Sequence, residues 1–467
     1  MWKLYTEKQV QARIDAAVAE AKAPLLKKIA ELEQKIVRLE KNSSNSSKPP
    51  SSDIVKPPKP GATRKRRKRR RGGQKGHPRH ERKPFTEEEI DRTVIYEQDL
   101  DPKEWEPLDE WDVQQQIELK ESPVEIIEHR ARKYRHRITG EIRRTALPEE
   151  VLAAGLLGTR MTSFVGYLKG ACHTSYSTIE TLLADVFNVE VSRGMLAKAV
   201  TGKISDALAA PYEELRAALP REERLGVDET GHKDTGEKFW TWCFRARQFT
   251  FFHIAGTRSS EVLMTLLGPA FDGVISCDYF SAYQKFMKIS SAIMQFCLAH
   301  LIRDVKFLAG SADKVTRNWA EKTLDEFREL FHLIHRRDKL SEAFFDRRLI
   351  EIRDRLIKRF KHAPDRPSVC DLQQRFRLHP NEYFTFVTTP GIEPTNNMTE
   401  QAIRYVVIDR LITQGTRGVK GQRWSERIWT TISTCETQGR SVFQYLCEAL
   451  NAHFNGRTAP SLLPMPP

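Results

Sequence analysis

The chain has 467 residues, of which 39% are hydrophobic and 30% charged, so it is long enough for roughly three domains and has the composition of a globular protein. Lys and Arg exceed Asp and Glu by 76 to 62, and the net charge of +14 favours a polyanionic partner. The seven widely spaced cysteines argue against a disulfide scaffold, and the lack of a signal region or of an apolar run of roughly 20 residues argues against a membrane partner and for a cytoplasmic location.

Residues 1–41 carry the pattern of an amphipathic helix. Apolar side chains recur in steps of four and three, at Leu25, Ile29, Leu32, Ile36 and Leu39. Such a heptad seam predicts a coiled coil and therefore a homodimer or a larger assembly, although two heptads give only marginal stability. A single helix that packs on its own chain is the alternative interpretation.

Residues 42–80 are rich in Ser, Pro and Lys and predict a disordered linker. A run of eight cations in this linker, together with Lys75, is expected to contact nucleic-acid phosphates without reading sequence. These cations are Arg64, Lys65, Arg66, Arg67, Lys68, Arg69, Arg70 and Arg71.

Residues 81–148 are expected to form a small β-rich module, because 113–119 and 124–137 alternate apolar and polar residues and 138–141 resemble a turn.

Residues 149–221 change to helical periodicity. Ser192 is placed to cap a helix that begins at Arg193, and this helix and the one before it are similar to a helix-turn-helix in which Arg193 is expected to contact DNA. Plain packing of two short amphipathic helices is the alternative.

Residues 222–310 alternate strand and helix patterns and predict a mixed α/β sheet, the first part of a catalytic domain. The expected strands end at Asp228 or span 239–247, 248–255, 273–278 and 292–297, and the expected helices span 259–267 and 298–308. Residues 311–365 predict a helical insertion, 366–420 the second part of the domain, and 421–467 a C-terminal helical region. The aromatic residues between 239 and 252 are expected to be sheet core.

Asp228 and Asp278 each follow a short apolar run, so both are expected at the ends of buried strands. Carboxylates are costly to bury alone, and two at strand ends predict a shared cation. Glu400, on a helix that starts near Asn396, offers a third carboxylate, and three such acids suit two Mg²⁺ ions at a phosphodiester. Glu393 is the rival third acid, but the proline that follows it places it before the helix.

Several neighbours of these acids are candidate auxiliary residues. Asn396, Glu400 and Arg404 are four residues apart on one helix face, where they are expected to hold metal and orient phosphate. Cys297 and His300 have the spacing of half a zinc site, but no second half is evident. Arg303 follows one turn later and is expected to face phosphate. A buried cysteine and a satisfied histidine are the alternative for the pair.

The chain resembles transposases of the insertion sequence 66 family, which belong to the DDE class, over nearly its whole length. The resemblance is carried by residues 45–53 of the linker and by five motifs: Gly72-Gly73-Gln74-Lys75-Gly76-His77, Asp228-Glu229-Thr230, Cys297-Leu298-Ala299-His300, Asn396-Asn397-Met398-Thr399-Glu400 and Gly415-Thr416-Arg417-Gly418. It implies an RNase H-like catalytic domain in which Asp228, Asp278 and Glu400 are catalytic and bind two Mg²⁺ ions, for which Mn²⁺ is expected to substitute. By the same resemblance, Cys297 and His300 support the active site.

The resemblance also implies the activity and the partners. The expected function is cleavage and strand transfer at transposon ends, with double-stranded DNA (terminal inverted repeats and target DNA) and accessory transposition proteins as partners. Family members commonly carry a zinc-finger-like segment after the basic arm, but this chain has no cysteine before Cys172, so zinc is not expected. A domesticated or inactive transposase that acts as a sequence-specific DNA-binding regulator is the alternative function.

The expected fold class is therefore multidomain α+β. A coiled coil, a basic linker, a β module and a helical DNA-binding region precede an RNase H-like domain with a helical insertion.

Overall fold

The computed structural model describes residues 7–40, 83–99, 101, 103–105, 108, 111–121 and 123–463, so the cations at 64–71 and Lys75 lie outside the described residues. The chain divides into two units, Met1–Pro58 with Arg130–Pro467, and Lys59–His129. In the described part of the smaller unit, the regular element is one helical turn, η2 (Glu87–Glu89). The side chain of Gln115 fastens the backbone N–H and C=O of Phe85 with hydrogen bonds of 2.7 and 2.9 Å.

The β-rich module expected at 81–148 is reduced to a short hairpin. Residues 113–119 form no strand, and of 124–137 only β1 (Lys133–Arg135) does so, paired with β2 (Ile142–Arg144) around the expected turn. All six strand residues are exposed. The alternation of apolar and polar residues was misleading here, because a sheet needs a second layer on which to bury its apolar face, and a lone two-stranded hairpin offers none.

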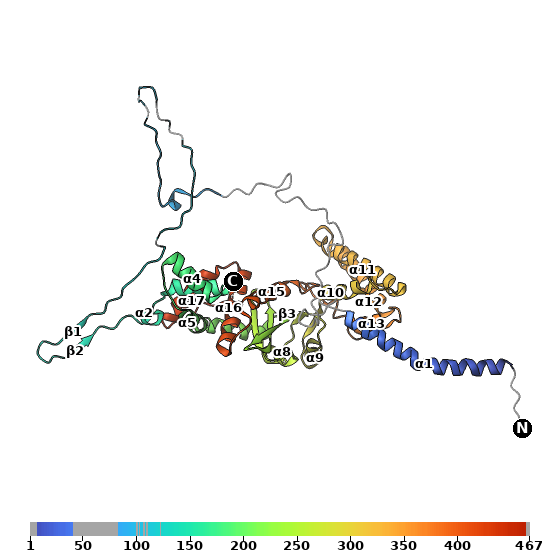
Figure 1. The fold of residues 1–467 in the computed structure, drawn as a ribbon. Coiled ribbons are helices and arrows are strands. Elements are labelled where there is room, and N and C mark those ends of the chain that lie inside the picture. The colour runs from blue at the N-terminus through green and yellow to red at the C-terminus, as the bar shows by residue number, and fades with distance from the viewer. Residues whose placement is uncertain are drawn as a thin grey trace. The chain divides into compact units, whose positions relative to one another are not determined.

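The larger unit is built around a five-stranded sheet with the order β5-β4-β3-β6-β7 (Figure 1). Its strands are β3 (Arg224–Asp234), β4 (Glu237–Arg245), β5 (Thr250–Ala255), β6 (Val274–Cys277) and β7 (Ile293–Phe296). β3, β4 and β5 are antiparallel neighbours, whereas β6 runs parallel to β3 and β7 parallel to β6. The chain is thus of the mixed α+β class, and the mixed sheet expected from 222–310 is present.

Helices connect the parallel strands, as the sequence predicts. α8 (Ser260–Leu267) lies between β5 and β6, α9 (Ser281–Ile289) lies between β6 and β7, and α10 (Leu298–Leu308) follows β7 directly. Ser259 caps α8 by accepting a hydrogen bond of 3.3 Å from the N–H of Glu261. The bounds of α10 agree with the expected helix at 298–308.

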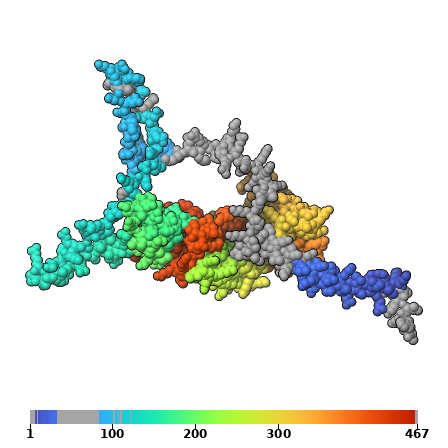
Figure 2. All heavy atoms as spheres, viewed as in Figure 1, coloured from blue at the N-terminus to red at the C-terminus, as the bar shows by residue number. Residues whose placement is uncertain are grey.

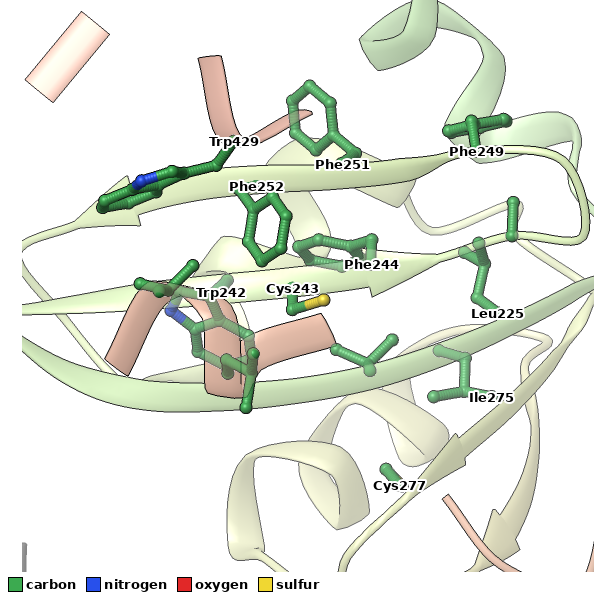
Figure 3. Close-up of a cluster of buried hydrophobic side chains, with 14 of the residues drawn as sticks. Leu225, Trp242, Cys243, Phe244, Phe249, Phe251, Phe252, Ile275, Cys277 and Trp429 are labelled. Carbon is green, nitrogen blue, oxygen red and sulfur yellow. The ribbon is translucent and has the colours of Figure 1, made fainter. Parts of the chain in front are cut away.

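The aromatic residues of β4 and β5 form the sheet core, as expected. Trp242, Cys243 and Phe244 follow one another on β4 and are all fully buried. Because successive strand residues point to opposite faces, this run shows that both faces of the sheet are covered. Figure 3 shows Phe252 of β5 beside this run, and the ring of Trp429 makes an edge contact with that of Phe252, with centroids 6.2 Å apart.

α16 (Val419–Gln438) covers the open edge of β5. Three side chains four residues apart on this helix accept hydrogen bonds from the backbone N–H groups of alternate β5 residues, Glu426 from Ile254 (2.7 Å), Thr430 from Phe252 (3.0 Å) and Thr434 from Thr250 (3.2 Å). An uncovered edge strand would leave these groups available to another chain. The helix therefore closes this side of the sheet.

The helices that precede the sheet pack with α16 and with the C-terminal helix α17 (Val442–Phe454). They are α2 (Glu149–Ala154), α3 (Thr159–Gly170), α4 (Tyr176–Phe187), α5 (Arg193–Lys198), η3 (Ala199–Ile204), α6 (Ser205–Ala207), α7 (Ala209–Ala218) and η4 (Leu219–Arg221). Ser192 caps α5 as expected, since its hydroxyl accepts a hydrogen bond of 3.2 Å from the N–H of Met195.

Glu149–Gly170 is long and apolar enough to cross a membrane by length and composition. In the structure this stretch is not one helix. A turn at Gly155 (φ 67°) separates α2 from α3, and both helices contact α17. The stretch therefore contributes to the packed helices of the larger unit.

The expected helical insertion consists of α11 (Lys314–Ile334), η5 (Arg337–Lys339) and α12 (Glu342–Lys361). α13 (Pro367–Leu378) packs on α12, so the helical block continues beyond the expected boundary at 365. α14 (Thr385–Thr388) and α15 (Asn397–Thr413) return the chain to the sheet, where α15 contacts β3 and β4.

The expected N-terminal helix is present as α1 (Glu7–Glu40), with Pro24 inside it, and it contacts α13. In its described part the seam residues remain exposed: Leu25 by 64%, Ile29 by 51% and Leu32 by 49%. The side chains of Ile36 and Leu39 lie outside the described residues. Contact with its own chain thus leaves Leu25, Ile29 and Leu32 exposed, and pairing through the seam remains a prediction.

Candidate active site

Asp228 lies in the middle of β3, not at its end as expected. The strand runs on to Asp234 because it forms a long hairpin with β4, which pairs residues 226–234 of β3. The parallel partner β6, however, pairs only with Arg224, Leu225 and Gly226. Asp228 therefore lies just beyond the part of β3 that is paired on both sides. On the side of β6 its backbone has no strand partner, as would be the case at the end of a strand.

Asp278 follows β6 directly, as expected. The parallel register pairs Gly226 with Ser276, and two residues further along this register Asp228 comes level with Asp278. Register neighbours on parallel strands lie about 4.8 Å apart with their side chains on the same face. Each aspartate also accepts a local backbone hydrogen bond, Asp228 from Glu229 at 2.9 Å and Asp278 from Phe280 at 3.0 Å.

Glu400 lies in the first turn of α15, the helix that packs on β3. Its side chain is 30% exposed, and its Oε1 is 3.6 Å from Nδ1 of His300. Both of these atoms are buried and have no hydrogen-bond partner among the described residues. The carboxylate thus carries a buried oxygen that is available to a ligand. Glu393, the rival acid, is exposed before the helix.

Burial and neighbouring charges raise the pKa values of the two aspartates. Burial raises the pKa of Asp228 well above its ordinary value, and the charges of Glu229, Asp278 and Glu400 raise it further. The pKa of Asp278 is also raised, first by burial and then by Glu229. Mutual repulsion between half-buried acids is relieved by a cation that they share.

Glu229 is excluded as a ligand by its own contacts. It points to the other face of β3, is buried, and accepts a hydrogen bond of 2.7 Å from Nε of Arg258. The hydroxyl of Tyr283 donates to its second oxygen. Arg258 and Tyr283 thus neutralise and fix this fourth acid. No sequence pattern marks these two residues, since they come from a loop and from α9.

Asn396 has a different role from the one expected. Its N–H donates to Sγ of Cys297 at 3.2 Å, its Nδ2 donates to the carbonyl of Val227 at 2.9 Å, and its Oδ1 accepts from Thr399 at 2.6 Å. These bonds engage the backbone N–H and both polar atoms of the side-chain amide of Asn396. It fastens the start of α15 to β3, one residue before Asp228, and so determines where Glu400 lies.

Gly226 permits this close approach. A Cβ at this position would lie 2.0 Å from Oγ1 of Thr399 and 2.9 Å from Oδ1 of Asn396. Glycine inside a strand often marks such a contact with another segment, so the sequence contained a signal that could have identified this residue.

Cys297 and His300 are brought against Glu400. One ligand atom from each of the three lies within 4.8 Å of the others. Burial raises the pKa of the Cys297 thiol and lowers the pKa of His300, in the latter case despite the charge of Glu400. Both groups are therefore neutral near pH 7 in the absence of a bound cation.

The remaining predicted residues lie apart from these contacts. Arg303 is half-buried on α10, near enough to lower the pKa of His300 by its charge. Arg404 is exposed on α15. Arg193 is exposed at the start of α5 and forms an ion pair of 3.2 Å with Glu180.

The donor atoms of the site suit a hard divalent cation. Asp228, Asp278 and Glu400 supply carboxylate oxygens, which Mg²⁺ and Mn²⁺ prefer, and one of these oxygens is buried without a partner. Fold and site together define a protein with a carboxylate centre at the open ends of parallel strands in a mixed sheet.

A comparison of the sequence with known protein families identifies the family to which the chain belongs. The family described as transposase IS66 family matches residues 154–423, more than half of the chain. The chain therefore belongs to the IS66 transposase family, and membership implies DNA as its partner and the use of a divalent metal. A family of unknown function (DUF6444) matches residues 4–83, and no curated protein matches.

Proposed function

We propose that the chain is an active DDE transposase, which cleaves transposon ends and transfers the freed strands to target DNA on an RNase H-like catalytic domain. One observation carries the proposal. The register of β3 and β6 brings Asp228 level with Asp278, and the pKa of Asp228 is raised by burial and then by the charges of Glu229, Asp278 and Glu400. Acids from three distant segments thus share one electrostatic environment.

In the proposed site, some residues are metal ligands and others position a ligand or contact DNA. Asp228, Asp278 and Glu400 hold the cations, and Asn396 positions Glu400 relative to β3. Bound Mg²⁺ supplies Lewis-acid polarisation of the scissile phosphodiester and lowers the pKa of the attacking water. Arg303, which is half-buried on α10 and acts electrostatically on His300, is our candidate for contact with a phosphate oxygen.

The reaction sequence needs no covalent bond between protein and DNA. Water attacks the phosphodiester at the transposon end, and the leaving oxygen becomes a free 3′-hydroxyl. This hydroxyl then attacks a target phosphodiester, so one P–O bond forms as another breaks. In both steps Asp228, Asp278 and Glu400 would hold the cations, the attacking oxygen loses its proton to solvent, and the leaving 3′ oxygen takes up a proton from solvent.

Paired substitutions test the proposal on duplex DNA that carries the terminal repeats flanking the gene. Glu400→Gln should reduce metal-dependent end cleavage by roughly 10³-fold, equivalent to about 4 kcal/mol of transition-state stabilisation, and leave end binding nearly intact. Glu393→Gln is the matched control and should cleave like the parent.

Loss of activity in Glu393→Gln with a normal Glu400→Gln would refute the assignment of the third acid. A parent protein that binds the ends but never cuts them would favour the regulator instead.

A further inference from the structure

The hairpin β1–β2 carries many more cations than acids. Between residues 129 and 144 the chain has seven Lys or Arg residues and one acid, Glu141. Every residue of the two strands is exposed, and Figure 2 shows the atoms of this hairpin in teal. The hairpin therefore contributes no core and is free to meet a partner.

The strand pairing places like charges opposite one another. Lys133 pairs with Arg144, and Arg135 with Ile142. Directly opposed residues of an antiparallel pair lie on the same face, so Lys133, Arg135 and Arg144 share one face. Among the described residues these three form no ion pair, whereas Arg143 on the other face pairs with Glu141 at 3.2 Å.

Like charges directly opposite destabilise a hairpin by a few tenths of a kcal/mol or more. A two-stranded hairpin is already marginal in water, so this arrangement weakens the element when it is alone. A polyanion that lies along the face removes the repulsion and gains one contact from each cation. The charge pattern thus matches a line of phosphates better than a single small anion.

We propose that the face formed by Lys133, Arg135 and Arg144 binds the phosphate backbone of duplex DNA as a β-ribbon. A major groove about 12 Å wide admits a two-stranded ribbon, and the exposed Ile142, which pairs with Arg135 on the same face, adds apolar surface for groove contact. The proposal rests on DNA as the substrate of the proposed function. It adds a DNA-binding element, outside both the basic linker and the helix-turn-helix.

The test measures binding of the full-length protein to uncut duplex DNA of random sequence in EDTA, across a salt series. The variant is Lys133→Ala with Arg135→Ala and Arg144→Ala. The slope of log K against log salt should fall by about 0.9 for each lost phosphate contact, close to three in total, and affinity at low salt should fall roughly 10-fold or more. Thermal unfolding should be unchanged, because the side chains are exposed.

Two control variants distinguish an effect of this hairpin face from an effect of the total positive charge of the protein. Lys322→Ala with Lys339→Ala and Lys361→Ala removes the same charge from exposed positions of the helical insertion and should leave the slope near that of the parent. Lys133→Arg with Arg135→Lys and Arg144→Lys keeps the charge and should retain binding.

The proposal is overturned if the hairpin variant keeps the parent slope, if the insertion variant loses as much, or if the loss appears only with single-stranded DNA. Because EDTA prevents metal-dependent chemistry, a failure of cleavage in the parent leaves this binding measurement unaffected. An inactive enzyme and a hairpin that does not bind DNA are thus told apart.

Discussion

At the scale of single residues, the position of Glu400 depends on a contact made by two other residues. Asn396 donates to the carbonyl of Val227, and Gly226 leaves the space in which Thr399 packs. The third acid is thereby fixed to the strand that carries the first. Small displacements of this kind cost an active site far more than they cost the fold.

Gly226→Ala should disturb that contact. Its Cβ would lie 2.0 Å from Oγ1 of Thr399, so the first turn of α15 must shift. We expect a loss of about 1–3 kcal/mol in the free energy of unfolding and a loss of cleavage greater than 10-fold, measured by urea denaturation and end cleavage. Gly202→Ala, where no atom lies within 4 Å of the added Cβ, is the control and should be near parental in both. Parental cleavage by Gly226→Ala would show that this contact does not position Glu400.

The candidate acids could be chosen from the sequence because each is marked by its local context. Asp228 and Asp278 follow apolar runs, and Glu400 lies just inside a helix start. The partners of Glu229 could not be chosen in this way, since Arg258 and Tyr283 reach it only through the folding of the sheet. Local patterns predict elements, whereas side-chain partners depend on tertiary packing.

At the scale of elements, the end of β3 is held by the segment around Thr416. Oγ1 of Thr416 donates to Asp234 at 2.7 Å and lies 2.9 Å from Nε2 of His232. Because the hydroxyl has a single proton, His232 must donate from Nε2, which leaves its Nδ1 unprotonated. That nitrogen is buried and has no partner among the described residues.

This arrangement predicts a pH dependence of stability. Burial, followed by the charge of Arg410, lowers the pKa of His232 to about 4, whereas Asp234, Asp409 and Glu426 act to raise it. The unfolded chain, with a histidine pKa near 6.5, therefore binds more protons than the folded chain between these values. The stability that His232 contributes is present above about pH 6.5 and is lost as the pH falls towards 4.

His232→Gln keeps a donor for Thr416 but removes the titration. Between about pH 7 and pH 4.5 it should lose less free energy of unfolding than the parent, by roughly 3 kcal/mol at most. Urea denaturation across this range measures the difference, with His335→Gln at an exposed position as the control. Equal losses in His232→Gln and the parent would contradict the account of a buried neutral histidine.

The strands and helices of 222–310 were predictable because apolar runs, caps and turns all agree there, as the bounds of α10 show. The prediction of a strand at residues 113–119 was wrong. Alternation of apolar and polar residues does not show whether another layer is present to cover the apolar face, and these residues are mostly exposed. The length of β3 was missed since its extension depends on pairing with β4.

At the scale of the whole molecule, the proposed joining of two ends would require at least two active sites, and we propose that chains pair through the seam of α1. We predict that Ile29→Asp with Leu32→Asp, which adds charge to the exposed seam, lowers paired-end complex formation by about 10-fold or more and leaves single-end binding much less affected. Light scattering and gel shift with one or two ends measure the two states.

Ala16→Asp with Ala23→Asp adds the same charge to exposed positions off the seam and should assemble normally. Paired-end assembly by the seam variant equal to that of this control would remove α1 from the assembly. Two heptads bury little area, so DNA and the catalytic domains are expected to contribute the rest of the pairing.

Metal rescue of a cysteine variant tests the carboxylate centre most directly. Asp228→Cys replaces a hard oxygen ligand with a softer sulfur ligand, so end cleavage should be lost with Mg²⁺ and partly restored with Mn²⁺. Glu393→Cys should cleave with either ion. Cleavage by Asp228→Cys at the parental rate with Mg²⁺, or no restoration under Mn²⁺ conditions in which the parent is active, would contradict the claim that Asp228 binds the catalytic metal.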